Sequence, residues 1–203
     1  MYFVKTPFLF KRILPKAIWD LYTTDPILYL TFDDGPVPET TPWVLSTLKE
    51  YNAKATFFCV GENVRKHSAL FHELVNGGHS IGNHTFNHLN GWKTSTDKYL
   101  ENVRQCREIT FPLFRPPYGR LKLSQYQRLL PEFTIVMWDV LSGDFDEKLN
   151  GEDCFKNVKN NAQKGSVIVF HDSIKAFPRL KTALPKVLKH FSKKGFRFEA
   201  IRL

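Results

Sequence analysis

Short apolar segments alternate with helical patterns along most of this chain, and that alternation constrains its fold more than any other feature. Helices are expected from Thr40 and at 63–76, 95–109, 153–162 and 179–192. The expected strands are 27–32, 55–60, 79–82, 111–115, 133–138, 167–170 and 196–201. Strand–helix alternation at this spacing is typical of parallel βαβ units. The pattern predicts an α/β fold, either an open doubly wound sheet or a barrel shorter than the eight-unit form.

The composition is that of one folded domain. Of the 203 residues 42% are hydrophobic and 24% are charged, which excludes a disordered or collagen-like protein. A formal net charge of +9 suits nucleic acid, a membrane surface or an acidic substrate. The chain has no run of five like charges and no nucleic-acid motif, so we expect a solvated basic surface and no nucleic-acid partner. Three widely spaced cysteines do not form a disulfide framework, and Cys59 is expected in the core.

The first 26 residues differ in pattern from the rest. They mix aromatic residues with lysine and arginine and give no clear signal peptide, and no stretch of 18 apolar residues indicates a transmembrane helix. We expect residues 1–26 to be a leader that packs on a domain formed by 27–203, with an amphipathic surface anchor as the alternative. A monomer that is cytoplasmic or held weakly at a membrane surface is favoured.

Polar residues stand where several predicted strands end. The first strand runs into Asp33 and Asp34, followed by Gly35 and Pro36. An Asp-Gly turn alone does not need Asp33, and adjacent residues in extended chain point in different directions. One carboxylate is therefore free to bind a metal while the other faces a substrate. After the third strand, His84 and His88 are spaced so that a helix or tight turn would bring both to one ion.

The later strand ends add further groups of this kind. Arg115 precedes two prolines, Asp144 follows the fifth strand, and His171 stands beside Asp172 after the sixth. A histidine next to a carboxylate suits general acid or base chemistry. Because the carboxyl ends of parallel strands share one edge, all these side chains are expected to converge.

Five segments at these strand ends resemble, in order, the motifs of the polysaccharide deacetylase family, which has the NodB homology domain and is also known as carbohydrate esterase family 4. They are Thr31–Pro36, His84–His88, Arg115–Tyr118, Trp138–Phe145 and Val169–Asp172. The resemblance covers residues 27–203, and its first two motifs are the most specific. It implies a single-domain, distorted (β/α)7 barrel. It also implies a hydrolase that removes N-acetyl groups from an N-acetylglucosamine-containing glycan, such as chitooligosaccharide or peptidoglycan.

The resemblance assigns a role to each polar residue. Asp34, His84 and His88 are implied as ligands of one divalent metal, with Zn²⁺ expected first and Co²⁺, Ni²⁺ or Mn²⁺ as others that suit the site. Asp33 is implied as general base and His171 as general acid. Arg115 is implied to hold Asp33, Asp144 to tune His171, and the backbone N–H of Tyr118 to stabilise the oxyanion.

The substrate-binding residues are proposed from side-chain type and position alone. Candidates are the apolar or aromatic side chains near the strand ends, namely Trp92, Pro117, Tyr118, Phe145 and Val169. Phe145 stands where many family members have Trp, Val169 where they have Leu, and Leu141 where they have the first Asp of the fourth motif. The altered fourth motif keeps a non-catalytic carbohydrate-binding protein open as an alternative. A hydrolase of a non-sugar C–N bond is a second alternative, because the metal chemistry does not depend on what lies beyond the amide.

Overall fold

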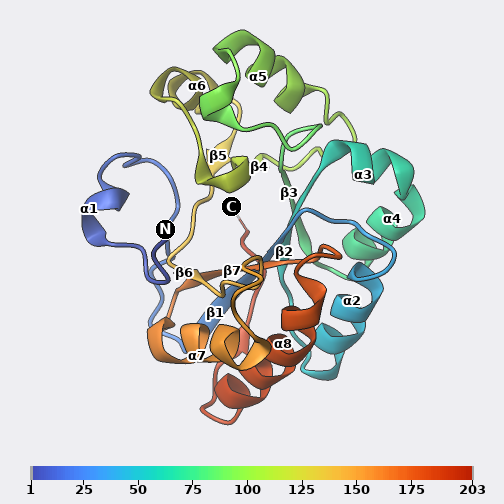
Figure 1. Cartoon of the computed structure of the whole chain (residues 1–203), viewed down its shortest axis with the longest axis vertical. Helices are drawn as coiled ribbons and strands as arrows, with labels where there is room; N and C mark the ends of the chain where they lie inside the picture. The colour runs from blue at the N-terminus through green and yellow to red at the C-terminus, as the bar shows by residue number, and fades with distance from the viewer. Residues whose placement is uncertain (1, 203) are drawn as a thin grey trace.

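The computed structural model describes residues 2–202 and shows a curled parallel sheet covered by helices (Figure 1). Seven strands follow the order β5-β4-β3-β2-β1-β7-β6, and an eighth, β8, pairs with the start of β1. The strands are β1 (Ile27–Asp33), β2 (Thr56–Cys59), β3 (Ser80–Asn83), β4 (Leu113–Phe114), β5 (Thr134–Ile135), β6 (Val140–Leu141), β7 (Val167–His171) and β8 (Arg197–Phe198). Every pairing between these strands is parallel, as expected for a distorted (β/α)7 barrel.

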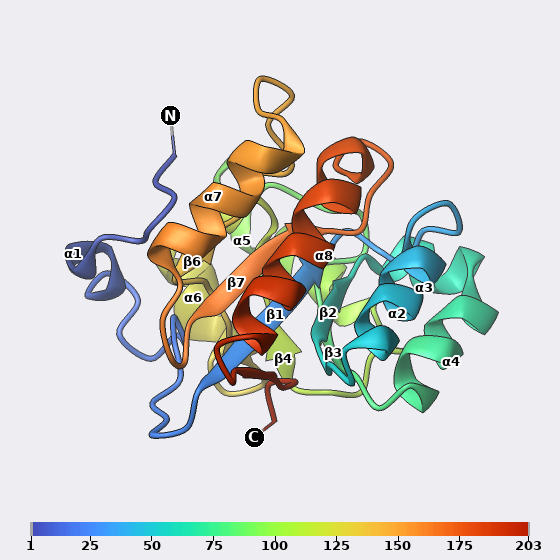
Figure 2. The same cartoon turned by 90° about the horizontal axis from the view of Figure 1, so that it is seen from below.

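Helices cover the outside of the sheet, and α7 and α8 lie side by side against it in both views (Figure 2). The α-helices are α1 (Phe8–Lys11), α2 (Thr41–Glu50), α3 (Gly61–Lys66), α4 (Ser68–Asn76), α5 (Thr96–Arg104), α6 (Leu123–Leu129), α7 (Gly151–Asn161) and α8 (Phe177–Ser192). Two short 3-10 turns, η1 (Gly91–Lys93) and η2 (Pro117–Gly119), lie in loops that follow β3 and β4. None of the described helices is long and apolar enough to cross a bilayer.

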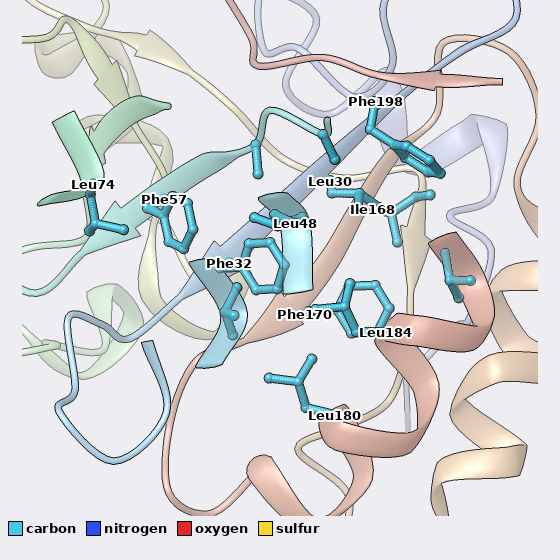
Figure 3. Packing of buried hydrophobic residues seen from close by; sticks show 14 of the residues in the cluster. Leu30, Phe32, Leu48, Phe57, Leu74, Ile168, Phe170, Leu180, Leu184 and Phe198 are labelled. Atoms are coloured by element: carbon cyan, nitrogen blue, oxygen red, sulfur yellow. The ribbon is translucent and has the colours of Figure 1, made fainter. Parts of the chain in front are cut away.

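The main core lies between the sheet and its helices. Phe32 on β1 stacks between Phe57 on β2 and Phe170 on β7, with ring centroids 5.0 and 6.0 Å apart, and Leu184 of α8 belongs to the same cluster (Figure 3). All four side chains are fully buried, and each contributes roughly 1.5–3 kcal/mol of hydrophobic stabilisation. Because side chains alternate along a strand, Thr31 and Asp33 face the opposite side, which is the barrel interior.

The barrel is open between its end strands, and the N-terminal segment (residues 2–26) lies across the opening. Among residues 2–202 no hydrogen-bonded pairing joins β5 to β6. Instead Lys5 forms an antiparallel bridge to Val140 of β6, and Ile18 forms a parallel bridge to Val136 next to β5. The backbone N–H of Leu141 also donates to the Val4 carbonyl at 2.8 Å. The same segment therefore contacts both edges of the sheet. A domain boundary after residue 26 stays a prediction. Met1 and Leu203, at the ends of the two predicted regions 1–26 and 27–203, lie outside the described residues.

Several sequence expectations differ from the structure in detail. The helix expected at 63–76 is two helices, because His67 has φ −128° and ψ 49° and so leaves the helical conformation. The strand expected at 133–138 is only Thr134–Ile135, and β6 and α6 were missed. The helix expected from Thr40 begins at Thr41, and the Thr40 hydroxyl donates to the Asp172 carbonyl. The three cysteines are buried and unpaired, in agreement with the sequence.

Candidate active site

Asp33 and Asp34 are directed to different partners at the end of β1. Asp33 is the last residue of the strand and stays in the interior face, where its carboxylate meets Arg115. Asp34 has φ 86°, a positive value that is uncommon outside glycine, and its side chain lies toward His84 and His88. The side chains of Asp33 and Asp34 therefore point in different directions, as expected for adjacent residues, and the strained backbone at Asp34 contributes to this separation.

Asp34, His84 and His88 form a group that can hold one metal ion. Their ligand atoms all lie within 4.8 Å of one another. The Asp34 Oδ1 atom is 3.2 Å from His88 Nε2 and 3.9 Å from His84 Nε2. The loop that carries the two histidines is irregular rather than helical, and His88 itself has φ 54°. Two imidazoles and one carboxylate are a common zinc-site donor set that leaves an open position.

The electrostatics of this group suit metal binding. His84 is fully buried, and its Nδ1 lies 2.8 Å from the Arg115 carbonyl. A carbonyl only accepts, so Nδ1 carries the proton and Nε2 presents a lone pair to the group. Burial lowers the pKa of His84 to about 4, which keeps the imidazole neutral at pH 7. Burial opposes ionisation of Asp34, but the His88 hydrogen bond and the neighbouring histidines outweigh it and hold its pKa well below the usual range.

Asparagines that the sequence analysis missed hold the histidine loop in place. Asn83 Oδ1 accepts from the Thr85 N–H at 2.8 Å, and Asn83 Nδ2 donates to the Val103 carbonyl. Asn102, on α5, accepts from the N–H groups of Phe86 and Asn87. Asn83 directly precedes the histidine motif, so its position in the sequence could have indicated a role at the site. Asn102 has no local sequence signal of this kind. Both asparagines are buried, so the loop is held by satisfied internal hydrogen bonds.

Arg115 holds Asp33 through a fully buried ion pair. The guanidinium Nη1 lies 2.7 Å from Asp33 Oδ1 and also donates to the Thr31 hydroxyl at 2.6 Å. Its other nitrogens donate to the carbonyls of Val136 and Met137, and the group stacks 4.1 Å above the Phe58 ring. With its donors bound to fixed partners, Arg115 cannot swing away from Asp33. Among the described residues no donor contacts Asp33 Oδ2, so that oxygen is left for a proton.

His171 is paired with Asp144 in the same way. His171 Nδ1 is 2.8 Å from Asp144 Oδ1, and the His171 backbone N–H donates to Asp144 Oδ2 at 2.8 Å. Burial lowers the pKa of His171, but the charge and hydrogen bond of Asp144 outweigh it and raise the pKa to about 10. Arg179, in the first turn of α8, is buried and donates to the Asp144 carbonyl. Asp33 and His171 are register partners on β1 and β7, so their side chains share one face.

Asp172 does not pair with His171, although the two are adjacent. It accepts from the Gly35 N–H at 3.0 Å and from the Thr41 hydroxyl at 2.6 Å, and so supports the loop after Asp34. Burial, aided by the charge of Asp34, raises the pKa of Asp172 to about 7, while the Thr41 hydrogen bond opposes the rise. A Cβ on Gly35 would lie 2.0 Å from Asp172 Oδ2, which explains why glycine occupies this position.

Tyr118 is presented by a strained turn beside His88. It has φ 60°, and its ring, 61% exposed, lies 4.7 Å from the His88 ring. Four of the five non-glycine residues with positive φ in residues 2–202 are Asp34, Thr85, His88 and Tyr118. Strained backbone concentrated in one place is characteristic of functional sites.

The candidate substrate-binding residues have contrasting positions. Phe145 packs against His171 with ring centroids 5.3 Å apart, and Tyr2 packs against Phe145 at 4.9 Å. The Tyr2 hydroxyl donates to Asp146 at 3.0 Å, so the N-terminal segment reaches the edge of the site. Tyr2 was not predicted, because nothing in its local sequence points to a partner 144 residues away.

The remaining three candidates divide between the surface and the interior. Trp92 is 60% exposed, with the Arg120 guanidinium 5.3 Å from its ring centre. Pro117 is buried next to Tyr118. Val169 is 1% exposed and is a register partner of Leu141, so two of the three departures from the family pattern are neighbours in the sheet.

Comparison with known proteins agrees with this geometry. The family model described as polysaccharide deacetylase matches residues 20–130, which is more than half of the chain. The chain belongs to the polysaccharide deacetylase family. The matched region contains Asp33, Asp34, the two histidines and Arg115, whereas Asp144 and His171 lie beyond it.

Individual members of the polysaccharide deacetylase family match over most of the chain. A peptidoglycan-N-acetylglucosamine deacetylase of Bacillus cereus is 32% identical over 191 residues, covering 90% of each protein. The crystal structure of the Bc1960 peptidoglycan N-acetylglucosamine deacetylase has a TM-score of 0.87 at 34% identity and covers 97% of this chain and 95% of its own. A peptidoglycan-N-acetylglucosamine deacetylase of Listeria monocytogenes is 31% identical, but the chain spans only 42% of that protein.

Proposed function

We propose that this member of the family is a metal-dependent hydrolase that removes the N-acetyl group from N-acetylglucosamine residues of a glycan. The observation that carries the proposal is the pairing of Asp33 with Arg115 and of His171 with Asp144 at the strand ends that also present the Asp34, His84 and His88 group. A base and an acid on one face, next to a possible metal site, are what hydrolysis of an amide requires. Relatives named as peptidoglycan-N-acetylglucosamine deacetylases support this substrate class.

The ligand group fits a divalent metal of borderline softness, and we propose Zn²⁺, with Co²⁺, Ni²⁺ and Mn²⁺ as ions the same donors accept. When bound, the metal polarises the acetyl carbonyl and makes water more acidic. The protein contributes a neutral His84 and an ionised Asp34, so these two donors need not lose a proton before binding. The Arg115 carbonyl orients His84, which links the metal ligands to the residue that holds Asp33.

Asp33 acts as the general base. Its Oδ1 is held by Arg115, so Oδ2 is directed at the water that attacks the acetyl carbon and takes a proton from it. His171 then donates its Nε2 proton to the departing sugar amine, because Asp144 on Nδ1 keeps the imidazolium charged at pH 7. One proton moves from water to Asp33, and one moves from His171 to the amine. Acetate and a free amino sugar are the products.

The turn at Tyr118 supplies the remaining group. No backbone acceptor is bonded to the Tyr118 N–H among residues 2–202, and the left-handed conformation of this residue is compatible with that N–H being free for a developing oxyanion. Pro117 on one side and Gly119 against Trp138 on the other fix the turn. Removing a donor of this type typically lowers kcat by about 10²–10³-fold.

Aromatic side chains around the polar centre provide a surface for sugar rings. Trp92 and Tyr118 are exposed, lie in loops after neighbouring strands and offer flat apolar faces. Phe145 packs beside His171, and Val169 is buried on the strand face that also carries His171. We propose that Trp92 contributes binding of the sugar and Phe145 contributes acyl selectivity. Changes of one methylene in such a pocket alter discrimination by about 1–3 kcal/mol.

The test is acetate release from N-acetylglucosamine oligomers and peptidoglycan fragments by protein that is stripped of metal and then reloaded with Zn²⁺ or Co²⁺. Release by the reloaded wild type, lost in Asp33→Asn, is the expected result. Asp25→Asn, an exposed carboxylate paired with Arg197 on the surface, is the matched control and should keep full activity. Sugar binding without turnover at any metal loading contradicts the proposal in favour of a binding protein. Turnover of formamides or cyclic amides alone contradicts its sugar specificity.

A further inference from the structure

The exposed apolar side chains of this molecule gather in the N-terminal segment. Eleven large apolar side chains are exposed among the described residues, and five of them belong to residues 3–13. These five, which we call the α1 patch, are Phe3 (51%), Phe8 (67%), Leu9 (70%), Phe10 (46%) and Ile13 (64%). In both views α1 lies at the edge of the molecule, beside the barrel (Figures 1 and 2). Single exposed apolar residues are ordinary, but a gathered set marks a contact surface.

The segment that carries the patch is fixed to the barrel on both sides. Lys5 and Lys11 reach inward to the buried carboxylate of Asp139, at 2.5 and 3.2 Å. Bridges at Lys5 and Ile18 join the flanking residues to the two edges of the sheet. The patch therefore cannot fold back into the core, and it is presented without a further ordering cost on binding.

The patch lies in a stretch of the chain whose charged residues are all basic. Residues 2–19 contain no Asp or Glu and four basic residues. Lys5 and Lys11 are neutralised by Asp139 and Asp20, whereas Arg12 and Lys16 have no acidic partner among the described residues. The Arg12 guanidinium lies 5.0 Å from the centre of the Phe8 ring, so positive charge and apolar surface are adjacent.

From these observations we propose that the α1 patch inserts into the surface of a membrane that contains anionic phospholipid. Aromatic and aliphatic side chains enter the headgroup boundary, while Arg12 and Lys16 meet the lipid phosphates. A second copy of the chain fits less well, because a twofold contact would bring these cations together on a molecule of net charge +9. A stable protein interface also needs about 1,000 Å² of complementary surface, which one helical turn does not offer. The proposal does not depend on the hydrolytic activity.

Sedimentation of the full chain with phosphatidylcholine vesicles, with and without phosphatidylglycerol, tests the proposal. We expect binding to the anionic vesicles that weakens at high salt. The triple variant Phe8→Ser, Leu9→Ser, Ile13→Ser should bind at least tenfold more weakly, because it loses apolar surface for insertion. Arg12→Gln with Lys16→Gln should lower binding to anionic vesicles by roughly 30-fold, since each basic residue contributes about 1 kcal/mol near such a surface.

The matched control replaces exposed apolar side chains elsewhere, as Phe111→Ser, Leu123→Ser, Ile174→Ser, and should bind as wild type does. Thermal unfolding of each variant confirms that it is folded. Absence of wild-type binding to anionic vesicles overturns the proposal, as does equal loss in the control. A concentration-dependent dimer that the triple variant alone abolishes, without vesicle binding, also overturns it and assigns the patch to self-association.

Discussion

Asp144 gives His171 its proposed role as an acid, and the pair can be tested by pH. The acid must be protonated, so activity falls as the pH rises through the pKa of His171, which Asp144 raises to about 10. In Asp144→Asn that pKa drops, and the falling limb of the pH–rate profile moves to lower pH. We expect kcat at neutral pH to fall by roughly 10²-fold. Asp146→Asn, which changes the neighbouring carboxylate that binds Tyr2, should leave the limb in place.

The same pair has a consequence for the stability of the metal-free protein. A histidine whose pKa is raised on folding stabilises the native state fully below its unfolded pKa of about 6.5, and this stabilisation is lost as the pH rises toward 10. The free energy of unfolding of wild type minus that of His171→Gln should therefore shrink steadily across this window. Urea unfolding of metal-stripped protein at several pH values measures it. A difference that stays constant with pH would show that His171 stabilises by packing alone.

A methyl group added at Gly35 is expected to disturb the Asp34, His84 and His88 group. An added Cβ meets the Asp172 carboxylate, whose two oxygens bind Gly35 N–H and the Thr41 hydroxyl. Gly35→Ala must displace either Asp172 or the loop that follows Asp34, at a cost of about 1–3 kcal/mol. We expect weaker Zn²⁺ binding by titration calorimetry together with lower stability. Unchanged metal affinity would show that the loop after Asp34 moves independently of its carboxylate.

At the scale of elements, much of the site was predictable because parallel strands place their carboxyl ends together. Asp33, His84, Arg115 and His171 each follow or end a strand that was expected from its apolar pattern, and the sheet brings them to one edge. The break at His67 and the short β6 were not predictable, because neither has a glycine or proline signal. Asn102 and Arg179 support the site from helices whose own periodicity says nothing about these contacts.

The N-terminal segment depends on a buried carboxylate that the sequence analysis did not single out. Asp139 is 1% exposed and is surrounded by Lys5, Lys11 and the Ser166 hydroxyl. Lys5→Met with Lys11→Met leaves it without a cation, which should destabilise the protein by about 3 kcal/mol, less than for a fully buried pair because both lysines are partly exposed. Urea unfolding measures this loss, and limited proteolysis should show cleavage within residues 2–20.

A control for that experiment is Arg65→Met, which breaks the exposed pair of Arg65 with Glu108 and should change stability by less than about 1 kcal/mol. Equal effects of the two changes would mean that burial of Asp139 does not matter.

At the scale of the whole molecule, metal binding should appear as thermal stability. A ligand at about 100 times its Kd adds about 2.7 kcal/mol to the native state, and for a chain of this size each kcal/mol raises Tm by about 2–4 °C. Reloading with Zn²⁺ should therefore raise Tm by roughly 5–10 °C over protein treated with chelator. His88→Ala should abolish the increase, whereas His72→Ala, outside the ligand group, should keep it. An increase that persists in His88→Ala would place the ion elsewhere.

The opening between β5 and β6 can be covered only after both the N-terminal segment and the edge of the sheet that binds it have been synthesised. The residues that cover it are synthesised well before the barrel edge that receives them, because Lys5 binds Asp139, which follows 134 residues later. Such distant contacts form late, because the intervening chain must be ordered before they form. A nascent chain that stalls before Asp139 therefore displays the cationic, aromatic segment 2–26 with no barrel edge to receive it. Docking of this segment requires that synthesis has passed β6, and a chaperone-binding assay on truncated chains would locate that point.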